Sequence, residues 1–178
     1  MGFFNMENDT YPYAGERVLL VSDSHGRTEH LEKAMERVKP GLILHMGDVE
    51  GDEDLIDAEA GCEVVYVRGN CDYSSDAPAS EVVAIGRHKV FMAHGHTFGV
   101  GFGLEGLAEA AKEAGCDHAF FGHTHVPMKT EVDGITVINP GSISLPRQDG
   151  RIPTFVVADV DRKGDLHFKL CEAVRKNI

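Results

Sequence analysis

The chain has 178 residues, 42% of them hydrophobic, which is enough to form one globular domain with a sizeable core. A formal net charge of −12 argues against stable binding to nucleic acid or to an anionic membrane. Bound cations can reverse the charge locally, so the acidity is compatible with a phosphate-bearing substrate. No apolar run is long enough to span a membrane, and the amino terminus lacks the pattern of a signal peptide.

The four cysteines are widely spaced and form no C-x-x-C pair (Cys62, Cys71, Cys116 and Cys171). This spacing argues against a zinc knuckle and is typical of reduced thiols, so we expect a cytoplasmic protein. Residues 1–15 are expected to form a flexible extension, and residues 16–178 a single domain. The sequence leaves open whether the chain forms a homo-oligomer.

Strands and helices are predicted to alternate in the first half of the chain. Apolar runs predict strands over 17–22, 42–45 and 64–67, and helical spacing predicts helices over 28–40 and 52–59. Thr28 is the expected N-cap of the first helix. The repetition of strand, loop and helix is typical of α/β layer architectures.

The second half of the chain has a different pattern. Strands are predicted over 82–85, 89–93 and 119–121, and a helix over 104–114. Hairpin turns are predicted at Asp133-Gly134 and near Lys163-Gly164. We therefore expect the tail to form a second, mostly antiparallel sheet.

Potential metal ligands follow five of the predicted strands, each close to a glycine. They are Asp23, His25, Asp48, Asn70, His94, His123 and His125. Open α/β sheets bind ligands at the carboxyl ends of their strands, so we expect these side chains to converge. Mixed carboxylate, amide and imidazole ligands suit Mn, Fe, Zn or Ni. Seven ligands exceed the need of one ion, whereas two ions that share a carboxylate would use them and suit phosphoryl displacement.

These motifs resemble those of the calcineurin-like metallophosphoesterases, and most of all their small bacterial and archaeal phosphodiesterase branch. The family pattern appears as Asp23-Ser24-His25, Gly47-Asp48, Gly69-Asn70-Cys71-Asp72, His94 and Gly122-His123-Thr124-His125, and Asn139-Pro140-Gly141-Ser142 extends the likeness. The resemblance implies an α/β fold in which two facing mixed β-sheets are flanked by helices.

The resemblance also implies a role for each ligand. One metal ion would be bound by Asp23, His25 and His125, the other by Asn70, His94 and His123, with Asp48 as the bridge. The expected ions are two divalent cations, with Mn in first place and Ni, Fe, Zn or Mg as alternatives. The implied activity is hydrolysis of a small phosphate ester, a diester rather than a monoester, by in-line attack of a metal-activated water.

One position departs from the wider family. Many members have a histidine where this chain has Cys71, and that histidine is assigned to transition-state stabilisation or leaving-group protonation. A cysteine is a poor proton donor to an alkoxide, so His96 is our candidate for this catalytic role. Asp72 is our candidate for a residue that orients a neighbouring imidazole.

Other interpretations stay open at single positions. Asp48 could cap the acidic helix that follows it, and Asn70 could be an ordinary turn residue. Residues 101–106 match G-x-G-x-x-G, but they do not directly follow a strand, which favours a lid or helix-entry loop over a nucleotide site. Four other histidines have no such setting and are expected to be surface or structural residues (His30, His88, His118 and His167).

The alternative function from another class is a non-catalytic scaffold. The same fold serves as a subunit of the retromer coat, where parts of the metal set are lost. The complete ligand set of this chain favours an enzyme, and only Cys71 keeps the scaffold interpretation open.

Overall fold

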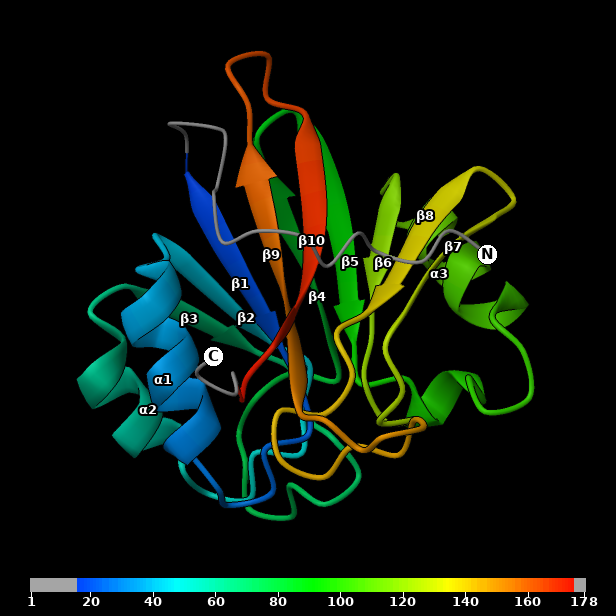
Figure 1. Ribbon diagram of the computed structural model, residues 1–178. Helices are drawn as coiled ribbons and strands as arrows, with labels where there is room; N and C mark the ends of the chain where they lie inside the picture. Colours follow the sequence, from blue (N-terminus) through cyan, green and yellow to red (C-terminus); the bar gives the residue numbers. More distant parts are fainter. Residues whose placement is uncertain (1–15, 175–178) are drawn as a thin grey trace.

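Two five-stranded sheets form the centre of the structure, a computed structural model that describes residues 16–174 (Figure 1). The first sheet has the order β10 (Leu166–Glu172), β9 (Thr154–Val160), β1 (Arg17–Val21), β2 (Leu42–His45) and β3 (Glu63–Tyr66). The second has the order β4 (Ser80–Ile85), β5 (His88–Ala93), β6 (His118–Phe120), β8 (Ile135–Asn139) and β7 (Met128–Val132). The extension predicted for residues 1–15 lies outside the described residues.

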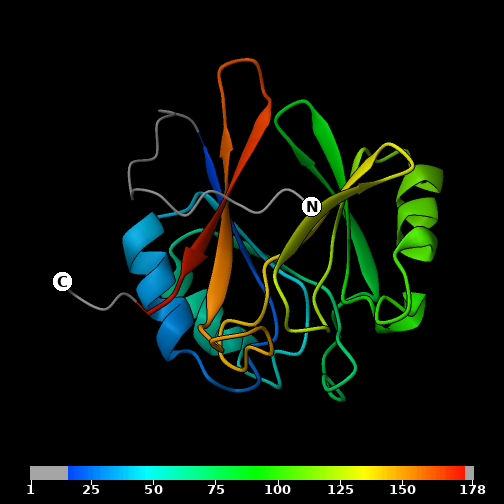
Figure 2. The ribbon, with the colours of Figure 1, turned by 45° about the vertical axis from the view of Figure 1, so that its right-hand side comes forward.

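Helices cover the outer faces of both sheets. Figures 1 and 2 show α1 (Glu29–Val38) and α2 (Glu53–Ala60) on the first sheet and α3 (Glu105–Glu113) on the second. A short 3-10 helix, η1 (His96–Phe98), follows β5. No helix within residues 16–174 is long and apolar enough to cross a membrane. The predicted fold class, two facing mixed sheets flanked by helices, is confirmed.

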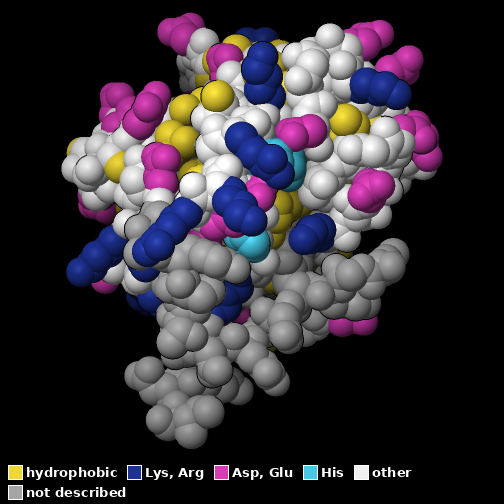
Figure 3. Space-filling view, turned by 90° about the horizontal axis from the view of Figure 1, so that it is seen from above, with side chains coloured by type: hydrophobic (Ala, Val, Ile, Leu, Met, Phe, Trp, Pro, Cys, Tyr) yellow, Lys and Arg dark blue, Asp and Glu magenta, His cyan; other side chains and the backbone are white. Residues whose placement is uncertain are grey.

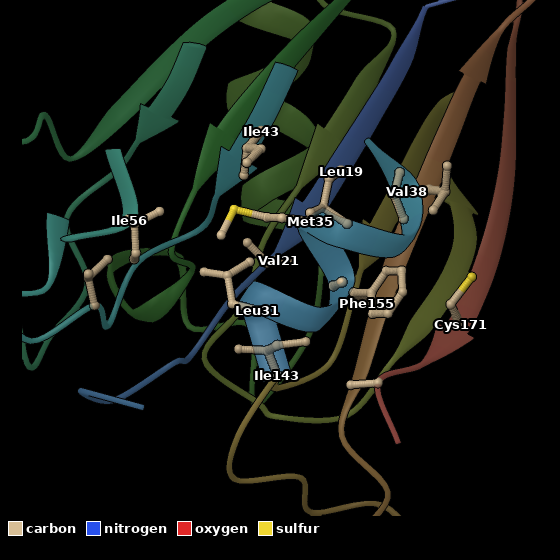
Figure 4. Packing of buried hydrophobic residues seen from close by; sticks show 14 residues of the cluster. Leu19, Val21, Leu31, Met35, Val38, Ile43, Ile56, Ile143, Phe155 and Cys171 are labelled. Atoms are coloured by element: carbon tan, nitrogen blue, oxygen red, sulfur yellow. The ribbon is translucent and has the colours of Figure 1, made fainter. Parts of the chain in front are cut away.

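The alternation of side chains along the strands divides the core into three layers. On β1, Leu19 and Val21 pack beneath α1 (Figure 4), whereas Leu20 points into the core between the sheets. On β6, Phe120 enters the core between the sheets and Ala119 packs on the α3 side. Both faces of these strands are buried, which explains their uninterrupted apolar sequences.

Helix α1 buries one side and ends in a left-handed residue. Its apolar positions at helical spacing are buried, and the N–H of Lys39 closes its last turn on the carbonyl of Met35. Thr28 occupies the predicted N-cap position, but its hydroxyl donates to Glu32 Oε1 at 2.6 Å and caps no backbone N–H. The N-cap of α2 is Asp52, so Asp48 is not a helix cap.

The predicted sheet of the tail is wrong in two respects. The hairpin β7–β8 joins the second sheet, which is mixed because the β5–β6 and β6–β8 pairs are parallel. The hairpin β9–β10 joins the first sheet instead, where β9 pairs antiparallel with β1. Local hydrophobic patterns identify a hairpin but do not specify which sheet edge it extends.

A buried histidine at the end of β2 joins the first two strand-end loops. The N–H of Gly47 donates to Nδ1 of His45 at 3.2 Å, so Nε2 carries the proton and donates to Ser24 Oγ at 3.0 Å. Burial lowers the pKa of His45 to about 4, so the ring is neutral at physiological pH.

We expect His45 to make the metal-free protein acid-sensitive. The unfolded chain binds a proton on this ring near pH 6.5 and the folded chain only near pH 4. The contribution of neutral His45 to the free energy of unfolding should therefore be complete above pH 6.5. It should decrease by about 2–3 kcal/mol as the pH falls towards 4. Chemical denaturation in chelator at pH 7 and pH 4.5 should give a smaller stability difference between wild type and His45→Asn at the lower pH. An equal difference at both values would contradict this account.

Candidate metal centre

All seven predicted ligands meet at one edge of the molecule, on the loops after β1, β2, β3, β5 and β6. The lower part of Figure 1 shows these loops side by side. Parallel strands direct their carboxyl ends to the same edge, which explains how residues from distant parts of the sequence converge.

One group of ligand atoms comes from the loops after β1 and β6. Nε2 of His125 lies 3.2 Å from Asp23 Oδ1 and also 3.2 Å from His25 Nε2. The ligand atoms of these three residues all lie within 4.8 Å of one another. This group is the set predicted for the first metal ion.

A second group lies beside the first. Asn70 Oδ1 is 3.0 Å from His94 Nε2 and 2.9 Å from His123 Nδ1. Asp48 Oδ2 lies 3.3 Å from His94 Nε2 and 3.7 Å from His25 Nε2, so its carboxylate faces both groups. Asp23 also lies within reach of this group, because Asp23, Asp48 and His94 offer ligand atoms within 4.8 Å of one another.

The hydrogen bonds on the outer side of the rings show which nitrogens face inward. Nδ1 of His94 donates to the carbonyl of Met46, and Nδ1 of His125 to that of Leu145, both at 2.6 Å. In their neutral forms these rings therefore direct the lone pair of Nε2 into the centre. Nε2 of His94 then faces the amide oxygen of Asn70, which is also an acceptor. Such contacts need a positive charge between the atoms, and divalent cations fit this donor set.

Two buried carboxylates supply the negative charge of the centre. Asp23 is completely buried, and its Oδ1 accepts no well-directed hydrogen bond from the described residues. Burial raises the pKa of Asp23, but the imidazoles of His125 and His94 outweigh it and hold this pKa below its usual range. Burial also opposes ionisation of Asp48, and His94 with the N–H of Cys71 lowers its pKa. Both groups are therefore carboxylates at neutral pH.

The two carboxylates in turn change the pKa values of the imidazoles beside them. Burial lowers the pKa of His94 and of His125, yet the nearby carboxylates of Asp48 and Asp23 respectively raise both above the usual value. In the metal-free site, protons thus occupy positions that cations would take, and metal binding should release protons.

Asp72 contacts backbone amides rather than the imidazole that we expected. Its carboxylate accepts from the N–H groups of Asp48, Glu50 and Gly69, each at 2.8 Å. It thereby fixes the loop after β2 against the loop after β3. This is a correction of its predicted partner, and it places Asp72 behind the ligands.

Several supporting residues were not predicted. Glu50 accepts from Nδ1 of His25 at 3.0 Å, and Ser142 Oγ donates to the carbonyl of Asp23 at 2.8 Å. Asn139 Nδ2 donates a hydrogen bond to the carbonyl of Gly122 at 2.8 Å. Asn139 and Ser142 lie in a stretch that resembles the family, whereas only the proximity of Glu50 to Asp48 in the sequence could have indicated it.

His96 lies at the border of the centre, on η1. Its ring centroid is 5.4 Å from that of His94 and 6.2 Å from that of His123. Burial lowers the pKa of His96, and His94 lowers it further. Its Nδ1 is buried without a hydrogen-bond partner among the described residues. Burial, with Asp48 beside it, raises the pKa of the Cys71 thiol to about 11, so Cys71 is not a thiolate at neutral pH.

The backbone of the site loops is strained. Six residues of these loops have left-handed φ angles: Asp23, His25, Asp48, Glu50, His123 and His125. Left-handed conformations are costly for side chains other than glycine and concentrate at functional sites. The loops also approach each other closely, because a Cβ on Gly122 would collide with Ser22 Oγ and one on Gly69 with Asp48.

The sequence is similar to bacterial proteins of known family. The probable metallophosphoesterase YsnB of Bacillus subtilis is 36% identical over 132 residues, which are 73% of this chain and 76% of that protein. The phosphodiesterase YfcE of Escherichia coli K12 is 27% identical over 157 residues, which cover 74% of this chain and 81% of YfcE.

Solved structures agree in fold. A predicted phosphoesterase of Streptococcus pneumoniae superposes with a TM-score of 0.76 at 29% identity, covering 90% of this chain and 91% of that one. Vps29 of Entamoeba histolytica in complex with Zn²⁺ gives a TM-score of 0.70 at 23% identity over 89% of this chain and 99% of Vps29, and this likeness concerns the fold alone. The family profile described as the calcineurin-like phosphoesterase superfamily domain matches residues 17–163. The chain therefore belongs to the calcineurin-like phosphoesterase superfamily.

Proposed function

We propose that this chain is a dinuclear metal-dependent phosphoesterase that hydrolyses a small phosphodiester in the cytoplasm. The observation that carries the proposal is the position of Asp48, whose carboxylate lies within 4 Å of an imidazole from each ligand group. Two groups that share one carboxylate suit two ions, with Mn²⁺ as the expected metal and Ni, Fe, Zn or Mg as alternatives.

The residues of the centre would have two roles, to bind the metal ions and to keep the ligands in position. Asp23, His25 and His125 would bind one ion, Asn70, His94 and His123 the other, with Asp48 between them. When bound, two divalent ions neutralise phosphate charge and lower the pKa of a coordinated water. Asp72 and Glu50 would keep the ligands in place, since their bonds fix the loop after β2 and the ring of His25. Two carboxylates leave a centre with two divalent ions positively charged, which favours a phosphate ester in an acidic protein.

The preference for a diester rests on similarity. YfcE is named a phosphodiesterase, and the motifs of this chain resemble the small phosphodiesterase branch. The alternative is a scaffold protein with the same fold, for which the Vps29 fold is the supporting observation. The complete, converging ligand set favours the enzyme, because a scaffold has no need for acceptor atoms that face one another.

We expect hydrolysis of an aryl phosphodiester to require added metal and to depend on Asp48. Across Mn, Ni, Fe, Mg and Zn, the wild type should be most active with Mn²⁺ and should prefer the diester to the matching monoester. Asp48→Asn should reduce kcat by about 100-fold or more, because a neutral amide would bind divalent ions more weakly than the carboxylate does. Asp54→Asn, an exposed position on α2, is the matched control and should keep full activity. Inactivity with every metal, or undiminished activity in Asp48→Asn, would refute the proposal that the chain is a metal-dependent phosphoesterase.

His96 is proposed to protonate the leaving group. A phosphate beside the ring would favour its protonated form, which the metal-free site disfavours. His96→Ala should therefore slow hydrolysis of an alkyl diester by about 100-fold and that of an aryl diester, whose leaving group needs no proton, much less. Steady-state rates with the two esters at pH 7 measure the difference. An equal loss on both would assign His96 to phosphate binding, and no loss on either would remove it from the site.

A further inference from the structure

A second group of potential ligands lies at the end of the strands remote from the metal centre. His88 begins β5 and His118 begins β6, whereas the metal centre lies at the other ends of these strands. His94 lies six positions after His88 along extended chain, a distance of roughly 20 Å. Figure 3 looks onto this remote end and shows histidine side chains among basic and acidic ones.

One carboxylate there contacts two imidazoles. Asp117 Oδ2 lies 2.7 Å from Nδ1 of His88, and its Oδ1 lies 2.9 Å from Nδ1 of His118. The two rings are edge to face, with their centroids 4.9 Å apart. The parallel pairing of β5 with β6 sets His118 opposite Val90, two residues from His88, so both histidines lie on the same face of the sheet. All three side chains offer ligand atoms within 4.8 Å of one another.

A fourth residue orients one of the rings from behind. Asp165, in the turn between β9 and β10, has its Oδ1 3.3 Å from Nε2 of His88. A carboxylate on the outer nitrogen leaves Nδ1 as the nitrogen available to an ion, as in carboxylate–histidine–metal arrangements. His118 is buried against the Phe168 ring, at 5.7 Å between centroids, and its side chain is 10% exposed. The rings are therefore held in place, while the half-exposed Asp117 leaves access from solvent.

We propose that His88, Asp117 and His118 form a second divalent-metal site, suited to Zn²⁺ and distinct from the catalytic centre. Two imidazole nitrogens and one carboxylate match zinc chemistry, and solvent would supply the fourth ligand. Zinc would take the place of the protons that lie on the two Nδ1 atoms, and each neutral ring would then carry its proton on Nε2. Zinc–ligand bonds near 2 Å require the hydrogen-bonded atoms to separate by about half an ångström, which the exposed Asp117 side chain allows.

Positive charge near the site sets a limit on affinity. Arg87 Nε lies 2.5 Å from Asp165 Oδ1, and Lys129 acts on His118 electrostatically. The carboxylates of Asp117 and Asp165 offset these two charges. Zinc should thus bind more weakly here than at the carboxylate-rich catalytic centre.

Occupancy of this site would connect the two sheets. His88 and His118 belong to the second sheet, and Asp165 belongs to a hairpin of the first. Figures 1 and 2 show the β9–β10 and β4–β5 hairpins side by side, and the N–H of Arg87 donates to the carbonyl of Gly164 at 3.0 Å. An ion held by His88 and oriented through Asp165 would stabilise this junction without contact with the substrate.

Equilibrium dialysis with zinc chloride tests the site on the full chain. The wild type should bind one more zinc ion per chain than Asp117→Asn and His88→Gln, or bind that ion at least about tenfold more tightly. Zinc should raise the midpoint of thermal unfolding more in the wild type than in either variant. Both variants should keep wild-type Mn²⁺-dependent hydrolysis, because neither residue touches the catalytic centre.

Asp133→Asn is the matched control, with the same substitution at an exposed turn of the same sheet, and it should bind zinc like the wild type. Anomalous scattering at the zinc edge should place the additional ion between His88, Asp117 and His118. Equal zinc stoichiometry and affinity in the wild type and both variants would overturn the proposal. An additional ion located elsewhere would also overturn it.

Discussion

The architecture of the candidate metal centre depends on acceptor atoms that face one another. Imidazole lone pairs, carboxylate oxygens and an amide oxygen converge within hydrogen-bond distance, and protons alone separate them in the metal-free chain. Unsatisfied acceptors in a buried site are costly, so the surrounding structure has to hold them in place. Backbone carbonyls fix His94 and His125, and Asp72 fixes the loop that carries Asp48.

The rest of the fold provides the rigidity that this arrangement needs. Four of the five strands that lead into the ligand loops, β1, β2, β5 and β6, are largely buried on both faces, between a core shared by the two sheets and the cores beneath the helices. Left-handed residues in the loops are tolerated because hydrogen bonds on all sides determine their conformation. His45 shows the same principle, since it is neutral, buried and bonded at both ring nitrogens. Strain at the site is thus offset by packing in the strands below it.

The sequence predicts the parts of this account that depend on local patterns. Apolar runs located the strands, and a glycine with a polar residue after each run located the ligand loops. Contacts across the chain were less accessible. Nothing near Asp72 indicates that it would bind backbone amides, and Asp165 meets His88 only because the β9–β10 hairpin returns to the first sheet. The contact between the rings of His88 and His118 follows from strand order, which sequence periodicity does not determine.

The central claim is that one edge of the molecule holds two ions that share Asp48. A crystal structure of the protein loaded with Mn²⁺, with anomalous data at the manganese edge, tests it most directly. The account predicts two peaks at this edge, about 3.5–4 Å apart, one beside Asp23, His25 and His125 and the other beside Asn70, His94 and His123, with Asp48 in contact with both. A single peak, or two peaks that do not share Asp48, would contradict it.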